Sequence, residues 1–313
     1  MVIYEYPFKE KINIPKSALA LGFFDGVHIA HRDLIETARR VADEKGLSLG
    51  VFTFGSTGGI KGNTMRLYGD GEKAEIFENL GADFMIIADF GSICGASGEE
   101  FVKDILVRDL NCQVCVAGFN FRFGNRALSG ESELRQYMSE AGGYAIIREE
   151  IKGEGSVTLS ATLIRDLVIG GEIKKANRIL GAPYYIKGRV LHGRKVGRNM
   201  GFPTVNIPIE DGRIIPRPGV YRSAVPIDGK IYAGVTNIGI CPTFEERKVH
   251  LETHIIGYSG DLYGRELKVF LLDFIRDEMA FSSPEELKMQ INIDKNKVID
   301  ESRDISWQEL GLK

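Results

Sequence analysis

Two histidines three residues apart stand at the predicted start of a long helix, in the segment GFFDGVHIAH (22–31). Backbone amides at a helix N-terminus attract phosphate, and both imidazoles project from one side of the first turn toward such a group. The pattern indicates nucleotidyl transfer, although an isolated pair of this kind more often caps and packs a helix start. The residues expected at this nucleotide site are Gly22, Phe24, Asp25, Gly26, His28 and His31.

Two further segments supply groups that suit the same chemistry. Ser160, Thr162 and Arg165 lie in SATLIR, at another predicted helix start, and offer hydroxyls and a guanidinium to a pentacovalent phosphate. In GFNFRFG (118–124), Asn120 and Arg122 alternate with phenylalanines that can stack on a planar ring. Alternating phenylalanines are also typical of an ordinary core, so this segment is weak by itself.

A basic, glycine-rich segment, HGRKVGRNMGFPTVN, occupies residues 192–206. Its glycines let a backbone approach phosphates, and its cations neutralise them. Thr204 and Asn206 are separated by one residue on an expected extended segment, so their oxygens point the same way and can share Mg²⁺. The segment is not the standard phosphate loop, and a structural hairpin stays an open alternative. The residues expected to bind nucleotide here are Gly193, Lys195, Gly197, Arg198 and Gly201.

Alternating strands and helices must position the N-terminal groups. Short apolar strands that alternate with amphipathic helices predict a Rossmann-like domain with a parallel sheet, and ligands then bind at the carboxyl ends of the strands. The expected strands are 17–24, 47–54, 82–90 and 113–119, and the expected helices are 31–46, 71–81 and 98–110.

The pattern changes from Tyr184 onward, where short strands are separated by Gly, Pro and Asp turns. Such spacing predicts a small antiparallel β-barrel, capped by a C-terminal helix over 284–303. We therefore expect two domains, 1–183 and 184–313. The expected barrel strands are 185–191, 219–227, 230–238, 250–257 and 267–275.

As a set, FDGVHIAH, GFNFRFG and LSATLIR resemble the adenylyltransferase module of bacterial bifunctional riboflavin kinase/FAD synthetases. The later blocks GFPTVNI, PGVY, NIGICPTF, LETH and DLYG resemble the riboflavin kinase of the same family. The resemblance implies that ATP phosphorylates riboflavin to FMN and then adenylylates FMN to FAD, with Mg²⁺ as cofactor.

The resemblance also implies residue roles in the C-terminal domain. Pro203, Thr204 and Asn206 belong to the family segment that binds magnesium and the ATP phosphates. Glu252 matches the general base that takes the proton of the ribityl 5′-hydroxyl, whereas the alternative for Glu252 is a solvent-facing strand glutamate. His254, two residues further on and on the same strand face, is expected only to support Glu252. Further expected binding residues are Asn237 and Arg276, the latter where family members close over the flavin, and a surface cation on a loop is the alternative for Arg276.

Two departures from the family pattern fall at the N-terminal site. Ala30 stands where the family has glycine between the histidines, and the sequence after Phe54 lacks the usual Pro-His-Pro loop. An alternative is therefore a riboflavin kinase whose N-terminal module is degenerate. A non-catalytic flavin- or nucleotide-binding regulator is a further alternative, although it would not require Glu252 and both expected metal ligands.

Composition limits the remaining function classes. The 313 residues are 43% hydrophobic and 27% charged, which suits two packed cores. A net charge of -3 gives no general attraction to nucleic acid or to anionic membranes, and the sequence shows no secretion signal or membrane span. We expect a cytoplasmic enzyme with small-molecule partners, either a monomer or a homo-oligomer. Cys112 and Cys115 have redox-motif spacing but are expected to be buried strand thiols.

Overall fold

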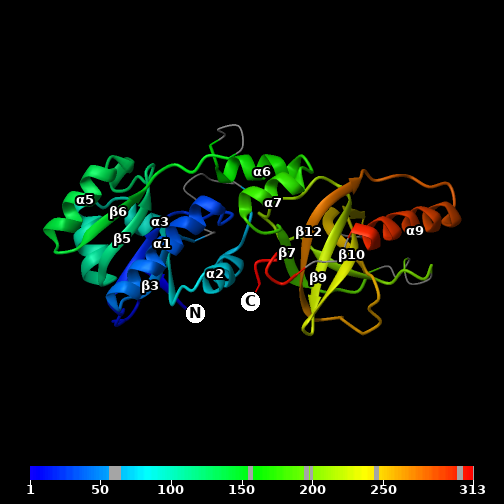
Figure 1. Cartoon of the computed structure of the whole chain (residues 1–313), viewed down its shortest axis with the longest axis horizontal. Helices are drawn as coiled ribbons and strands as arrows, with labels where there is room; N and C mark the ends of the chain where they lie inside the picture. Colours follow the sequence, from blue (N-terminus) through cyan, green and yellow to red (C-terminus); the bar gives the residue numbers. More distant parts are fainter. Residues whose placement is uncertain are drawn as a thin grey trace. The chain divides into compact units, whose positions relative to one another are not determined.

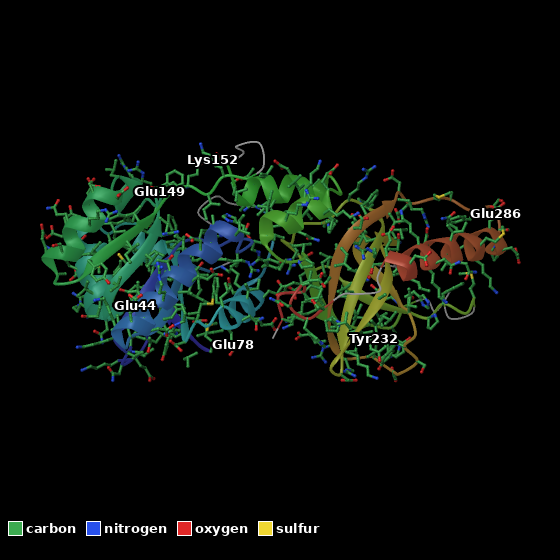
Figure 2. All side chains as sticks on the ribbon, in the orientation of Figure 1. Glu44, Glu78, Glu149, Lys152, Tyr232 and Glu286 are labelled. Carbon is green, nitrogen blue, oxygen red and sulfur yellow. The ribbon has the colours of Figure 1, made fainter. Side chains whose placement is uncertain are left out.

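The computed structural model describes residues 1–55, 65–153, 158–193, 197, 200–242, 247–301 and 306–312 (Figure 1). The chain forms two compact units, Met1–Ala161 and Thr162–Lys313. Charged side chains such as Glu44, Glu78 and Glu286 project outward from the helices that carry them (Figure 2). Among the described residues, no helix combines the length and the apolar character needed to cross a bilayer.

The first unit is built on a six-stranded parallel sheet with the order β1-β4-β3-β2-β5-β6. The parallel sheet with covering helices confirms the predicted fold class of this half. Its strands are β1 (Val2–Tyr6), β2 (Ser17–Leu21), β3 (Ser48–Phe54), β4 (Phe84–Ala88), β5 (Cys112–Gly118) and β6 (Tyr144–Arg148). Its helices are α1 (Ile29–Lys45), α2 (Asp70–Asn79), α3 (Phe90–Ile93), α4 (Gly98–Glu100), η1 (Phe101–Asp109), η2 (Asn125–Ala127) and α5 (Glu131–Glu140).

Two hydrophobic cores cover the two faces of this sheet. One contains buried residues of α1 and α2, and the other contains buried residues of η1 and α5. All five residues of β2 are buried, as expected for a central parallel strand. Cys112 and Cys115 lie buried in β5 as free thiols, and burial raises the pKa of Cys112 to about 12.

The order of the strands reverses between β2 and β5. The chain runs from β2 through α1 to β3 on one side, and it later returns to place β5 on the other side of β2. Loops that leave the carboxyl ends of β2 and β5 therefore diverge to opposite faces and open a crevice between them. This crevice is where the sequence predicts ligand binding in the first unit.

The second unit begins with two helices and continues as an antiparallel barrel. Its strand order is β7-β12-β9-β10-β11-β8, and the backbone amide of Leu191, just after β7, donates to the carbonyl of Asn206 in β8 at 2.8 Å. This bridge nearly closes the barrel, which confirms the second predicted fold class. The elements are α6 (Ala161–Ile169), α7 (Ile173–Leu180), β7 (Tyr185–Arg189), β8 (Thr204–Pro208), β9 (Gly219–Ile227), β10 (Lys230–Pro242), β11 (Arg247–Ile255), β12 (Glu266–Arg276) and α9 (Pro284–Glu301).

Helices α6 and α7 group with the barrel. The side chain of Asn177 in α7 donates to the carbonyl of Leu271 in β12 at 2.9 Å and accepts from the amide of Tyr184 at 2.8 Å. The compact units divide just after the first residue of α6, whereas the sequence pattern changes at residue 183, after α7. The boundary at 183 stays a prediction about the two domains.

Candidate active sites

The loops after β2, β5 and β6 enclose a pocket of about 250 Å³ in the first unit. Its walls come from four segments, so residues far apart in the sequence meet at one edge of the sheet. The lining residues are Phe23, Asp25, His28, Ala30, His31, Leu34, Gly118, Phe119, Asn120, Arg148, Glu149, Glu150, Ile151, Thr158, Leu159, Ser160 and Ala161.

His28 and His31 stand together at the N-terminus of α1. Their rings stack with centroids 3.6 Å apart and an interplanar angle of 18°. The Nδ1 atoms of both are buried and have no hydrogen-bond partner among the described residues. Burial lowers the pKa of His28 to about 4, and burial together with the neighbouring His28 holds the pKa of His31 well below 6.5. Both imidazoles are therefore neutral at pH 7 and can donate hydrogen bonds without carrying charge.

The loop between β2 and α1 holds the histidines through its buried residues. Phe24 is fully buried, and its ring meets the edge of His31 with centroids 5.1 Å apart. Phe24 and Val27 have positive φ angles of 53° and 43°, and Gly26 has φ 84°. A Cβ at Gly22 would lie 2.9 Å from the Phe24 ring. Gly22, Phe24 and Gly26 thus shape the loop and do not line the pocket.

Asp25 is also buried but does line the pocket. It is 3% exposed, and its Oδ1 accepts from the backbone amide of Leu67 at 3.1 Å. The carboxylate therefore connects the loop after β2 to the segment that precedes α2.

Two of the other predicted residues of this site belong to the pocket wall. Asn120 and Ser160 line the pocket, whereas Arg122 lies against Gly130 at the start of α5, where a Cβ would come within 2.4 Å of its guanidinium. Thr162 and Arg165 belong to α6 and are described with the second unit.

Several lining residues were not singled out by the sequence prediction, although Phe119 lies in the segment GFNFRFG, whose phenylalanines were expected to be able to stack on a planar ring. Phe119 is 46% exposed, and its backbone amide donates to the carbonyl of Arg148 at 2.9 Å. Arg148 binds Asp33 of α1 through two hydrogen bonds of 2.7 and 2.9 Å, which joins the end of β6 to α1. An aromatic residue directly after the apolar strand β5 was the available signal for Phe119. Arg148 gave no comparable signal, because its partner lies 115 residues away.

In the barrel, the register aligns the predicted catalytic and metal-binding residues. Asn206 of β8 lies opposite Glu252 of β11, which in turn lies opposite Asn237 of β10. These directly paired positions form a row across the strands, which continues through Val220 of β9 to Arg276 of β12. Directly opposed residues of antiparallel strands share a face, with Cβ atoms roughly 5 Å apart. Asn206, Glu252 and Asn237 are therefore neighbours on one face of the sheet.

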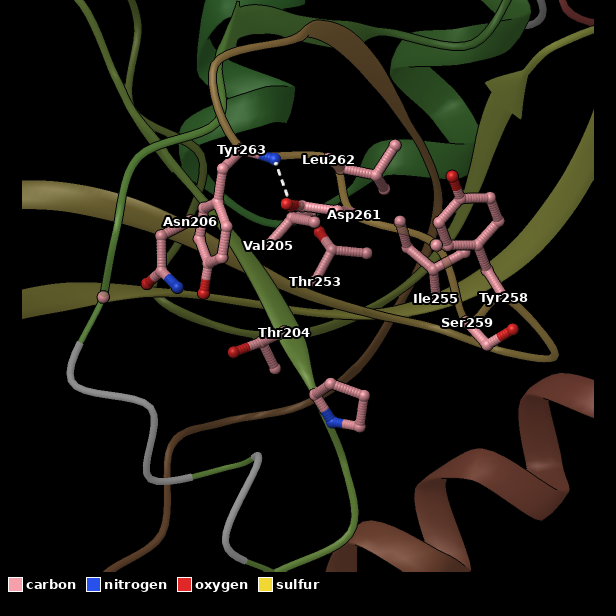
Figure 3. A pocket seen from close by; sticks show the side chains of 13 residues that line it. Thr204, Val205, Asn206, Thr253, Ile255, Tyr258, Ser259, Asp261, Leu262 and Tyr263 are labelled. Atoms are coloured by element: carbon pink, nitrogen blue, oxygen red, sulfur yellow. Dashed lines mark hydrogen bonds between the residues drawn. The ribbon is translucent and has the colours of Figure 1, made fainter.

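A cavity of about 530 Å³ lies beside Thr204 and Asn206 (Figure 3). A Cβ at Gly193 would lie 2.4 Å from the Asn206 amide, so only glycine allows the loop to approach that side chain. Glu252 is not a lining residue; it stands next to Asn206 in the row. The lining residues are Gly193, Pro203, Thr204, Val205, Asn206, Thr253, Ile255, Tyr258, Ser259, Gly260, Asp261, Leu262 and Tyr263.

The glycine-rich segment turns back on itself before β8. The amides of Met200 and Phe202 both donate to the carbonyl of Gly197, at 3.1 and 2.8 Å. Gly201 has φ 87°, a conformation that favours glycine. The predicted cations Lys195 and Arg198 lie outside the described residues.

His254 holds the start of β8. It lies opposite Thr204, and its Nδ1 is 3.0 Å from the carbonyl of Pro203. Because a carbonyl only accepts, Nδ1 carries the proton. Burial chiefly lowers the pKa of His254, the charge of Lys295 lowers it further, and the Pro203 carbonyl opposes both. A neutral His254 thus fixes the backbone next to Thr204.

Arg276 is engaged with α9. Its guanidinium donates to the carboxylate of Asp294, with a shortest distance of 2.8 Å, and to the carbonyl of Asp277 at 2.9 Å. Asp294 is 3% exposed, so this is a buried ion pair that fastens α9 to β12. Asn237, the other predicted residue of the row, lies 3.4 Å from Glu278 through its Nδ2.

The oxygens at the start of β8 are of a kind that suits a magnesium ion. Among the described residues, no cluster of three His, Cys, Asp or Glu side chains is placed to hold a metal. Thr204 and Asn206 offer neutral oxygens on one strand face, beside the cavity. Mg²⁺ prefers oxygen ligands and commonly keeps water and substrate phosphates in its coordination shell.

Comparison with known proteins identifies the family of both halves. A riboflavin kinase family model matches residues 180–301, and an FAD synthetase family model matches residues 10–162. Bifunctional riboflavin kinase/FMN adenylyltransferases of Bacillus subtilis and Escherichia coli K12 are each 34% identical to the chain. These alignments cover 91% and 88% of this chain and 92% and 90% of the two relatives.

A solved structure has the same fold over nearly the whole chain. It is a crystal structure described as a macrolide-efflux protein from Streptococcus pneumoniae, with a TM-score of 0.85 and 27% identity. The match covers 96% of this chain and 99% of that protein. Together with the two curated relatives, these matches show that the chain belongs to the family of bifunctional riboflavin kinase/FMN adenylyltransferases.

Proposed function

We propose that this chain makes FMN and FAD in two successive reactions. The barrel transfers the γ-phosphoryl group of ATP to riboflavin, and the pocket of the first unit transfers the AMP moiety of a second ATP to FMN. The observation that carries the kinase half is the alignment of Asn206, Glu252 and Asn237 on one sheet face. Curated relatives with both activities in their names support the bifunctional reading over a kinase alone.

In the kinase reaction, Glu252 accepts the proton of the ribityl 5′-hydroxyl as that oxygen bonds to the γ-phosphorus and ADP leaves. Phosphoryl transfer depends mainly on positioning and on stabilising charge. Thr204 and Asn206 would hold Mg²⁺, which spreads the charge of the transferred phosphate. His254 keeps Thr204 in place through the Pro203 carbonyl.

In the adenylyl transfer, a phosphate oxygen of FMN bonds to the α-phosphorus of ATP and pyrophosphate leaves. The neutral imidazoles of His28 and His31 donate hydrogen bonds to the phosphate oxygens on which charge develops, at the positive end of α1. Asp25 holds the loop that carries them. A cytoplasmic location and a requirement for Mg²⁺ are part of the same proposal.

The proposal is tested by incubating the protein with riboflavin, ATP and Mg²⁺ and resolving riboflavin, FMN and FAD by chromatography over time. We expect FMN first and FAD later. Glu252→Gln should lower the rate of FMN formation at least about 100-fold, because a general base contributes roughly 100- to 10,000-fold. The same variant should still convert added FMN to FAD.

Glu266→Gln serves as the matched control, because Glu266 is an exposed glutamate of β12 whose carboxylate pairs with Lys187. It should retain both rates. FMN without FAD from the unaltered protein would show that the first unit is degenerate. Formation of neither product would refute the enzymatic proposal and favour a flavin- or nucleotide-binding regulator.

A further inference from the structure

Three hydroxyl side chains form a hydrogen-bonded chain inside the barrel. The Oγ of Ser223 in β9 lies 2.7 Å from Oγ1 of Thr236 in β10, which lies 2.8 Å from Oγ1 of Thr253 in β11. All three residues are fully buried, as are the neighbouring apolar side chains of Ile238 and Leu251. A buried hydroxyl left without a partner costs roughly 1–3 kcal/mol, so each member depends on the others.

The barrel leaves space for this chain at one glycine. Gly234 of β10 lies opposite both Ser223 and Ile255. A Cβ at Gly234 would lie 2.6 Å from Oγ of Ser223 and 2.9 Å from Cγ2 of Thr253. The hydroxyl chain therefore requires that residue 234 has no side chain.

The hydroxyl chain is tied by sequence to the row of proposed catalytic residues. Thr236 precedes Asn237, and Thr253 follows Glu252. Thr236 lies opposite Thr253, just as Asn237 lies opposite Glu252. Because successive side chains point to opposite faces of a sheet, a slip of one residue would exchange the two faces.

A slip of two residues would keep the faces but separate the hydroxyl partners. Either error would leave buried hydroxyls unpaired, whereas a core of interchangeable aliphatic side chains would penalise a two-residue slip far less. The correct pairing of Thr236 with Thr253 thus enforces the correct pairing of Asn237 with Glu252.

We propose that Ser223, Thr236 and Thr253 are positioning residues for phosphoryl transfer, which act by fixing the register of β9, β10 and β11 and thereby the placement of Glu252. Thr253 also stands in the wall of the cavity beside Val205 (Figure 3). The inference rests on the kinase half of the proposed function, and it assigns these hydroxyls no contact with the reacting atoms.

The test is Thr236→Val, which keeps the shape of the side chain and removes the central hydroxyl. Misplacement of a catalytic group by about 1 Å can lower a rate about 100-fold, so we expect kcat for FMN formation to fall at least about 10-fold. The KM for ATP should change less than about 3-fold, because the glycine-rich segment that is expected to bind the nucleotide lies outside these three strands. Thr236→Ser, which restores a hydroxyl, should recover most of kcat.

Val225→Ala is the control for simple destabilisation. Val225 is a fully buried residue of β9 on the same inner face as Ser223. It should lower Tm at least as much as Thr236→Val while retaining kcat. FAD formation from added FMN should be unchanged in every variant, because that reaction belongs to the first unit, and the Tm of each variant reports whether the barrel is folded.

A triple variant, Ser223→Ala with Thr236→Val and Thr253→Val, distinguishes two effects of the hydroxyls. One is the fixing of the strand register, and the other is the stability lost when a buried hydroxyl has no partner. Removing all partners together is far less destabilising than removing one. We expect Tm to recover toward that of the unaltered protein while kcat stays low. Recovery of kcat in the triple variant, or an unchanged kcat in Thr236→Val, would overturn the inference. Absence of FMN formation by the unaltered protein would instead refute the proposed function.

Discussion

Acid should destabilise the first unit through His28. This side chain is 4% exposed, and its burial lowers its pKa from 6.5 to about 4. The unfolded chain therefore binds the proton more tightly than the folded chain does. The stability conferred by a neutral His28 is fully present above pH 6.5 and is lost as the pH falls toward 4.

The size of the effect follows from the two pKa values. At pH 5 the unfolded histidine is mostly protonated and the folded one mostly neutral, which reduces the free energy of unfolding by about 2 kcal/mol relative to pH 8. Below pH 4 the loss from His28 reaches about 3 kcal/mol. The pKa of His31 is shifted in the same direction and adds to the loss.

Hydrogen exchange measures this loss in the unit concerned. Amides of β2 and α1 should report an opening free energy that falls by at least about 2 kcal/mol between pH 8 and pH 5, after correction for intrinsic exchange rates. His28→Asn, which keeps a polar residue at the N-terminal cap of α1, should reduce the pH dependence by about that amount. His250→Asn, in the other unit, should leave it unchanged.

Two results would refute this reasoning. One is an NMR titration of the His28 ring with a midpoint at or above 6.5, which would mean that the ring is solvated. The other is a His28→Asn variant whose amides lose as much stability at pH 5 as those of the unaltered chain.

Two further substitutions test the sites. Ala30→Gly removes a Cβ from the pocket wall in the first turn of α1, so we expect a several-fold lower KM for ATP in FAD formation, with a stability loss of up to about 1 kcal/mol; an unchanged KM in steady-state assays would show that this Cβ does not crowd the nucleotide. Asp294→Asn removes the charge that pairs with Arg276, so local unfolding of α9 should become easier by roughly 3 kcal/mol, with faster hydrogen exchange over Pro284–Glu301 and not in β3.

The fold could be predicted wherever burial leaves a periodic apolar pattern. Strand β2 and helix α1 have such patterns, and both lie within a few residues of the predicted bounds. Strands β1 and β6 were not predicted. They are the two edge strands of the sheet and are partly exposed, so neither carries a continuous buried run. Helix α5 was also missed, because only Leu134 and Met138 of its residues are buried.

The sequence groups candidate site residues where they lie within one short segment. His28 and His31 share a helical turn, and Thr204 and Asn206 share a strand face. Contacts between distant segments gave no such signal. Arg276 has its partner Asp294 on a helix that follows β12, so its assignment as a flavin-binding residue did not anticipate its role in fastening α9. Nor did GFNFRFG indicate that Arg122 would lie against Gly130.

The two proposed sites depend on their sheets in different ways. In the first unit, loops that leave the ends of parallel strands carry the site, so a small change within a strand moves His28 only through the loop. In the barrel, Glu252 lies within a strand and is aligned by its neighbours on both sides. Substitutions inside β10 or β11 should therefore impair FMN formation even when they destabilise the barrel only slightly. Comparable substitutions inside β2 or β3 should impair FAD formation only when they destabilise the first unit more strongly. The chain can accordingly lose or alter the loops of its adenylyl-transfer site while its kinase site stays intact. Only the kinase site depends on the register of the strands that form the core of its own unit.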